Sequence, residues 1–175
     1  IYANDFKFDS NPLLGKKPDF ERLKAIGNSK KGVIALICDS TNADLPGKTP
    51  SESVAREMLR DVLLGTDSSG KAIIITTFSS QIARLKSIVS FAKQLNRKII
   101  FLGRSLRKYI KAAEKINLVN FSEDWEIVGF SSKIERKLKK VERMGRDKYI
   151  IVVTGHQGEE NSVLSKIAND QFPLR

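Results

Sequence analysis

Cysteine and histidine are almost absent from this sequence, whose 175 residues include one of each, Cys38 and His156. A single cysteine cannot form an internal disulfide bond, and one cysteine with one histidine cannot supply the usual nitrogen and sulfur ligands of a zinc site. A zinc hydrolase that is complete in itself is therefore nearly excluded.

Long apolar runs are also missing, since no stretch approaches the roughly 18 residues that a membrane-spanning helix needs. Residues 1–5 lack the basic and apolar stretches of a signal peptide. We therefore expect a soluble, cytoplasmic protein that binds no membrane. Because the first residue is Ile1 and not Met, we also expect the chain to be a piece of a longer protein.

Acidic residues are too few to balance the basic ones, and the 31 Lys and Arg against 20 Asp and Glu give a formal net charge of +11. The whole excess lies between Arg84 and Lys148, where 18 basic residues face 7 acidic ones. A solvated surface explains scattered lysines, whereas concentration in one stretch favours binding of a polyanion. The basic segments alternate with apolar runs, so nucleic acid is favoured over a membrane surface.

Apolar runs rich in β-branched residues predict strands buried on both faces, at residues 33–38, 72–75, 99–102 and 149–153, with a shorter strand at 125–130. Apolar side chains at helical spacing predict helices at residues 54–63, 82–92, 106–116 and 134–141. This alternation predicts an α/β fold with a mostly parallel, Rossmann-like sheet and helices on both faces.

Residues 1–32 contain several Pro and Gly, and only a short helix at 18–25 is predicted there. We expect these residues to belong to another sheet layer. Asp5 and Asp9 flank a short alternating segment, which predicts a strand that points both carboxylates the same way. Asp39 follows the predicted strand 33–38, and Ser51 is placed to cap the helix after it.

The predicted strand ends are rich in small polar residues, at 39–42, 77–81, 103–105 and 154–159. Ligands of open parallel sheets bind beyond these carboxyl ends. Each junction alone is explained equally well by a helix cap, a tight turn or a surface histidine. Together they leave room for a ligand and supply hydrogen-bond donors.

Cations at the start of one predicted helix strengthen this interpretation. Arg104, Arg107 and Lys108 oppose the helix dipole, at a cost of up to roughly 1 kcal/mol each when no anion is bound. Phe78 could stack on a base or pack against the next helix. No phosphate-binding Walker loop, dinucleotide fingerprint or serine nucleophile elbow is present in the sequence.

Short blocks that occur in order along the chain resemble ribonuclease J, of the metallo-β-lactamase and β-CASP superfamily: residues 4–9, 39–43, 46–47, 49–52, 77–80, 103–105 and 154–159. The resemblance implies that residues 1–40 end the first metallo-β-lactamase segment, 41–160 form the β-CASP domain and 161–175 begin the return. It also implies a parent enzyme of RNA processing and decay that hydrolyses phosphodiesters with two zinc ions, combining 5′-to-3′ exonuclease and endonuclease activity.

The resemblance also implies roles for single residues. Asp5 matches the aspartate that bridges the two zinc ions, and Asp39 matches the catalytic acid of the first β-CASP motif. The family's histidine motif is absent, so we expect the isolated chain to hold no zinc and to be inactive. The chain departs from the family at Asn4, where a glycine is usual, and at His156, where a serine is usual.

The expected partners are RNA and the remainder of the metallo-β-lactamase domain. The predicted RNA contacts are Ser40, Thr41, Thr77, Phe78, Ser79, Ser80, Arg84, Gly103, Arg104, Ser105, Arg107, Lys108, Gly155, His156 and Gln157. Three alternatives stay open. The chain could be a nucleotide-binding module without catalysis, a structural piece that supplies the surface of a homodimer, or a DNA-directed relative with the same topology.

Overall fold

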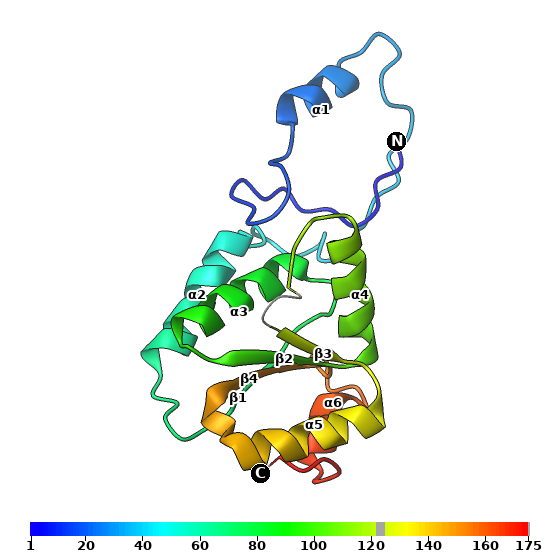
Figure 1. The fold of residues 1–175 in the computed structure, drawn as a ribbon. Coiled ribbons are helices and arrows are strands. Elements are labelled where there is room, and N and C mark those ends of the chain that lie inside the picture. Colours follow the sequence, from blue (N-terminus) through cyan, green and yellow to red (C-terminus); the bar gives the residue numbers. More distant parts are fainter. Residues whose placement is uncertain (122–124, 175) are drawn as a thin grey trace. The chain divides into compact units, whose positions relative to one another are not determined.

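The computed structural model describes residues 1–121 and 125–174, and the chain divides into two units, Ile1–Glu57 and Met58–Arg175. The boundary falls within helix α2 (Glu52–Gly65). Figure 1 labels the elements of both units, which are described separately below.

The second unit is built on a four-stranded sheet in which every neighbouring pair is parallel. Its strands lie in the order β1 (Ile73–Thr76), β4 (Tyr149–Val153), β2 (Lys98–Leu102) and β3 (Trp125–Val128). The strands predicted at 72–75, 99–102, 125–130 and 149–153 are all present, which confirms the prediction of a mostly parallel α/β fold. Each strand is followed by a helix, as parallel pairing requires.

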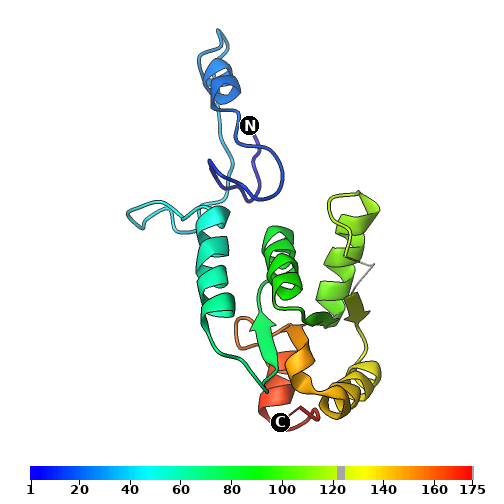
Figure 2. The same ribbon diagram turned by 60° about the vertical axis from the view of Figure 1, so that its left-hand side comes forward.

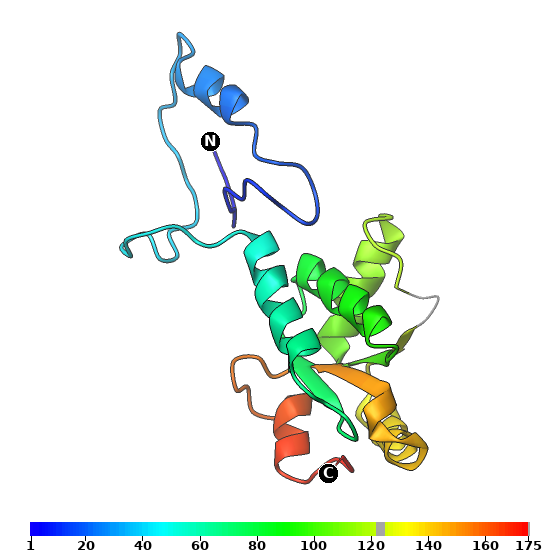
Figure 3. The ribbon, with the colours of Figure 1, turned by 90° about the vertical axis from the view of Figure 1, so that its left-hand side faces the viewer.

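Helices cover both faces of this sheet, as predicted (Figure 1). One face packs against α3 (Ile82–Gln94) and α4 (Arg104–Lys115), and the other against α5 (Ser131–Met144) and α6 (Val163–Ala168). Figures 2 and 3 show the two layers from other sides. A short 3₁₀ helix, η1 (Arg146–Lys148), connects α5 to β4.

Strand β4 shows why the predicted apolar runs are continuous. All five of its residues are buried, and their side chains alternate between two cores. Ile150 and Val152 belong to the α3 and α4 side, whereas Tyr149, Ile151 and Val153 belong to the α5 and α6 side. A strand covered on both faces needs apolar residues at every position.

The first unit differs from its prediction in two places. The predicted strand at 33–38 is wrong, because the run forms only an isolated parallel bridge between Tyr2 and Ile37, and Ile34 is fully exposed. The alternating strand around residues 6–8 is also wrong, since this segment has no ladder partner among the described residues. An apolar run forms a buried strand only where it can pair with a neighbouring sheet.

The short helix predicted at 18–25 is present as α1 (Phe20–Gly27), shifted by two residues. Its first turn is closed by Asp19, whose side chain accepts a hydrogen bond of 2.9 Å from the Arg22 N–H. Among the described residues of both units, no helix is long and apolar enough to cross a membrane.

The register pairs Ile74 of β1 with Ile151 of β4, which gives a matched test of this core. Ile151 is fully buried, whereas Ile74 is 39% exposed. We expect Ile151→Ala to lower the free energy of unfolding by about 2–5 kcal/mol and Ile74→Ala to lower it by about 1 kcal/mol or less. Urea unfolding of both variants measures the difference, and equal losses would contradict the assigned layers.

Candidate functional site

The carboxyl ends of the strands in the second unit lie side by side. The register aligns Thr76 with Val153, Val153 with Leu102, and Leu102 with Val128. The segments that follow these residues therefore share one edge of the sheet. They include most of the predicted RNA contacts: Thr77, Phe78, Ser79, Ser80, Gly103, Arg104, Ser105, Gly155, His156 and Gln157.

Two side-chain contacts join these segments to one another. The hydroxyls of Ser79 and Ser105 lie 3.0 Å apart, which connects the ends of β1 and β2 across the intervening β4. The ring of Phe78 meets the ring of His156 edge to face, with centroids 4.6 Å apart. Phe78 is 44% exposed, so part of its ring stays open to solvent and to a ligand.

A cavity of about 370 Å³ lies at the ends of β2, β3 and β4. This volume is within the usual range of small-ligand pockets, which is about 300–1,000 Å³. The predicted residues Gly103, Arg104 and Ser105 line it. Sequence analysis missed other polar residues in its wall, namely Ser131, Asn161 and Lys166. Ser131 could have been found, because it follows the predicted strand at 125–130.

Gly103 and Gly155 are required at this edge because neighbouring strand-end segments pack closely against them. A Cβ on Gly103 would lie 2.6 Å from Cγ2 of Thr154, and Gly103 has a φ of +140°. A Cβ on Gly155, at φ +123°, would lie 2.6 Å from Oγ of Ser162 and 2.7 Å from Cβ of Leu164. Both positions therefore exclude side chains, and this allows neighbouring junctions to approach closely.

Three helices begin at this edge without a side-chain cap among the described residues. The residues before α3, α4 and α5 are Gln81, Gly103 and Phe130, and none of their side chains accepts a cap hydrogen bond. By contrast, Ser162 caps α6 by accepting a 3.1 Å hydrogen bond from the Ser165 N–H. Uncapped helix starts leave backbone N–H groups available to water or to an anion.

The first turn of α4 adds positive charge to these N–H groups. Arg104 is exposed, and the Arg107 guanidinium lies 5.7 Å from the centroid of the Phe130 ring. Lys108, which is also exposed, follows directly after this turn. No acidic residue is present in this turn. The remaining predicted cation, Arg84, lies in the first turn of α3. The edge thus combines cations, backbone donors, hydroxyls and an exposed aromatic ring.

The predicted residues Asp5, Asp39, Ser40 and Thr41 belong to the first unit, where all are exposed. Asp39 closes a local turn, because its carboxylate accepts hydrogen bonds from the Thr41 hydroxyl at 2.8 Å and from the Thr41 N–H at 3.2 Å. The hydroxyl and then the N–H of Thr41 lower the pKa of Asp39, which keeps it ionised at neutral pH.

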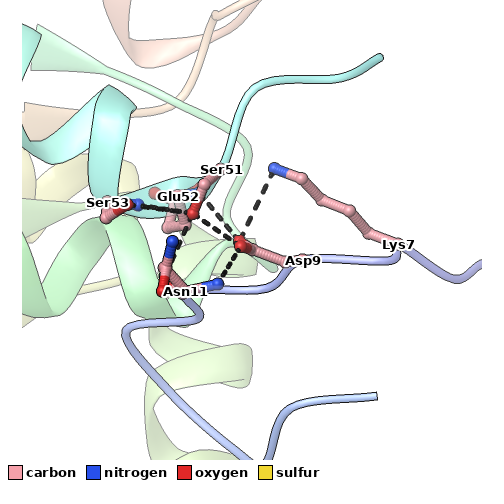
Figure 4. A network of polar contacts seen from close by, with 6 residues as sticks. All are labelled: Lys7, Asp9, Asn11, Ser51, Glu52 and Ser53. Atoms are coloured by element: carbon pink, nitrogen blue, oxygen red, sulfur yellow. Dashed lines mark hydrogen bonds and ion pairs between the residues drawn. The ribbon is translucent and has the colours of Figure 1, made fainter. Parts of the chain in front are cut away.

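Asp9, which was expected to point with Asp5, is buried instead. Figure 4 shows its polar contacts. Its carboxylate accepts hydrogen bonds from the Glu52 N–H at 2.8 Å, the Ser51 hydroxyl at 2.5 Å and the Asn11 N–H at 2.9 Å. These bonds, the Glu52 N–H first, lower the pKa of Asp9. Asp9 therefore stabilises the start of α2 from 43 residues away in the sequence.

The start of α2 also confirms the predicted cap, since the Ser51 hydroxyl accepts a hydrogen bond of 3.3 Å from the Ser53 N–H. The capping of this helix is shared between a neighbour in sequence and the distant Asp9. Only Ser51 could be predicted from the sequence, because cap residues are recognised by their position directly before a helix.

Comparison with known proteins identifies the family. A sequence model described as the β-CASP domain of ribonuclease J matches residues 70–173. The chain belongs to the ribonuclease J family. It is 44% identical over 175 residues to ribonuclease J of Methanocaldococcus jannaschii, covering all of this chain and 39% of that protein.

Two further ribonuclease J relatives agree. The chain is 39% identical over 172 residues to ribonuclease J of Pyrococcus abyssi, covering 98% of this chain and 37% of the relative. It is 32% identical over 169 residues to ribonuclease J2 of Bacillus subtilis, covering 97% of this chain and 28% of the relative. The chain thus spans less than two-fifths of the length of these relatives. The resemblance found in the sequence is confirmed for the family and for the β-CASP fold.

The close packing around Gly155 can be tested by comparing an alanine substitution there with one at Gly158, which lies in the same loop of this β-CASP domain. Gly158 also has a positive φ, +74°, but a Cβ there would meet nothing within 4 Å. We expect Gly155→Ala to lower the free energy of unfolding by about 2–4 kcal/mol, because backbone strain and a clash add. Gly158→Ala, which adds backbone strain alone, should cost about 1 kcal/mol. Urea unfolding measures the free energy of unfolding of both variants. A smaller loss of stability in Gly155→Ala than in Gly158→Ala would contradict the packing argument.

The role of Asp9 predicts a pH dependence in the first unit. Because the pKa of Asp9 is lowered from its ordinary 3.8, its stabilisation of α2 is present above that value and is lost as the pH falls through the lower folded-state pKa. We expect Asp9→Asn to speed hydrogen exchange at the Glu52 N–H at neutral pH. The control is Asp5→Asn, which removes an exposed carboxylate, and equal exchange in the two variants would rule out this role.

Proposed function

We propose that this chain is the RNA-clamping part of a zinc-dependent ribonuclease J-like enzyme that hydrolyses RNA phosphodiester bonds. The proposal extends to exonuclease and endonuclease activity of the parent enzyme and to a cytoplasmic role in RNA processing. Membership of the family supports it, since the relatives are named ribonuclease J.

The observation that carries the proposal is the joining of the strand-end segments at one basic edge. Ser79 and Ser105 lie in hydrogen-bond contact there, and Arg104 lines the adjacent cavity. Hydroxyls, backbone N–H groups and cations are the groups that contact RNA phosphates, and an exposed ring such as Phe78 can stack on a base. We assign the predicted contacts on this edge to RNA.

The zinc ions of the parent enzyme would need ligands beyond this chain. Among the described residues, no three His, Cys, Asp or Glu side chains gather closely enough to hold a metal ion. We propose that Asp5 contributes one carboxylate to metals held mainly by the rest of the enzyme, and that Asp39 supports them from nearby. On this proposal the isolated chain is inactive, and its own residues bind and orient RNA.

The first unit has the surface of an incomplete domain. Among residues 1–57, all of them described, only Asp9 and Glu52 are buried, while Tyr2, Ile34 and Leu36 are more than half exposed. Contiguous exposed apolar side chains are typical of an interaction site. We propose that the remainder of a metallo-β-lactamase domain covers them and supplies the sheet that the run at 33–38 lacks.

Binding of labelled single-stranded RNA by the purified chain tests the RNA assignment. We expect Arg104→Gln with Arg107→Gln to weaken binding about tenfold or more, since each charge-assisted hydrogen bond contributes ~1.5–3 kcal/mol. The slope of log affinity against log salt should fall by about 1.4, at about 0.7 per phosphate contact. Fluorescence anisotropy at several salt concentrations measures both quantities.

The matched control removes two exposed cations of α5 instead, with Lys140→Gln and Arg143→Gln. It changes the net charge equally and should leave the affinity nearly unchanged. A mononucleotide that bound as tightly as an RNA of ten nucleotides would favour the nucleotide-binding module, and a DNA strand that bound more tightly than RNA would favour a DNA-directed relative. Unchanged affinity in the Arg104 and Arg107 variant would contradict the assignment.

A further inference from the structure

Helix α4 carries four cations on one narrow stripe of its surface: Arg104, Lys108, Lys111 and Lys115. They are spaced by four, three and four residues, so at 3.6 residues per turn they fall within an arc of about 60°. All four are exposed, and none of their side chains makes a hydrogen bond or ion pair with another described residue. The opposite side of the helix is buried through Leu106, Ile110 and Ala113.

This stripe is unfavourable for the helix that carries it. Cations three or four residues apart repel one another, so each of the three successive pairs destabilises the helix. Arg104 also lies in the first turn, where the helix dipole opposes positive charge, and only Lys115 in the last turn is well placed. The one acid of the helix, Glu114, accepts a hydrogen bond of 3.0 Å from the Phe121 N–H. Stability of the free helix therefore does not explain the stripe.

The stripe is continuous with the strand-end cavity. Its first member, Arg104, lines that cavity, and α4 then runs away from the end of β2 (Figure 1). From Arg104 to Lys115 the helix rises by about 16 Å, at about 1.5 Å per residue. A polyanion bound at the cavity could extend along the helix and meet a cation on each turn.

We propose that single-stranded RNA leaving the strand-end cavity runs along α4, with Lys108, Lys111 and Lys115 each contacting a backbone phosphate. The inference rests on the proposed function and extends it, because it assigns the path of the chain beyond the cavity. Ammonium groups on flexible stems contact phosphates as point charges, so this path binds without regard to base sequence. RNA is favoured over an acidic protein segment because the stripe begins at the cavity already assigned to RNA.

The test compares Lys111→Gln with Lys115→Gln against the α5 control, Lys140→Gln with Arg143→Gln, each in the full 175-residue chain. Affinity is measured for single-stranded RNAs of about 4 to 16 nucleotides, a range of footprints typical of single-strand binding modules. We expect the α4 variant to bind the shortest RNA as the unaltered chain does and the longest about fivefold or more weakly. Its salt slope for the longest RNA should fall by about 1.4.

The outcomes separate this inference from the function on which it rests. RNA binding by the unaltered chain, with no loss in the α4 variant or with an equal loss in the α5 control, would overturn the path and leave the proposed function standing. A loss that is the same for short and long RNAs would also overturn it. Failure of the unaltered chain to bind RNA would overturn both. An acidic peptide that competed for α4 as well as RNA does would assign the stripe to a protein partner.

Discussion

Burial of β4 on both faces is the constraint on which the second unit depends. All five of its residues pair with β2 and four of them pair with β1, and their side chains enter two separate cores. Helices must therefore cover both faces of the sheet, which leaves the strand ends as the places where polar chemistry can occur. Parallel pairing then brings the starts of successive helices to the same edge. The candidate site follows from the way the core is built.

Charge at this edge works against the local stability of the fold. Helix starts favour anions, yet the first five residues of α4 include Arg104, Arg107 and Lys108 and no acidic residue. Ser162 closes the start of α6 with a side-chain cap, whereas the helices after β1, β2 and β3 lack one among the described residues. One bound polyanion, as proposed, would both neutralise the unfavourable charge and accept hydrogen bonds from the uncapped helix starts.

The strands and helices of the second unit were predicted well from the sequence. The apolar residues of its strands form short continuous runs, whereas those of its helices recur every three or four positions. The prediction failed for the run at 33–38, since burial of a strand depends on a partner sheet and not on the run itself. The Asp9 bonds to Ser51 and Glu52 were missed because they join residues more than 40 positions apart. The Ser79 and Ser105 contact could be anticipated only as a shared edge, because strand order does not follow sequence order.

The two units differ in what holds them together. The second has two apolar cores, whereas the first has backbone bridges near Ile37, the polar network around Asp9 and ring contacts of Phe8 with Phe6 and Phe20. Hydrogen bonds contribute little net free energy when water can replace them, so a segment held mainly by them is weakly stabilised. Exposed side chains such as Ile34 and Tyr2 would add the missing apolar burial once another surface covered them. On the proposal that a further domain covers residues 1–57, that domain would supply the apolar burial that they lack.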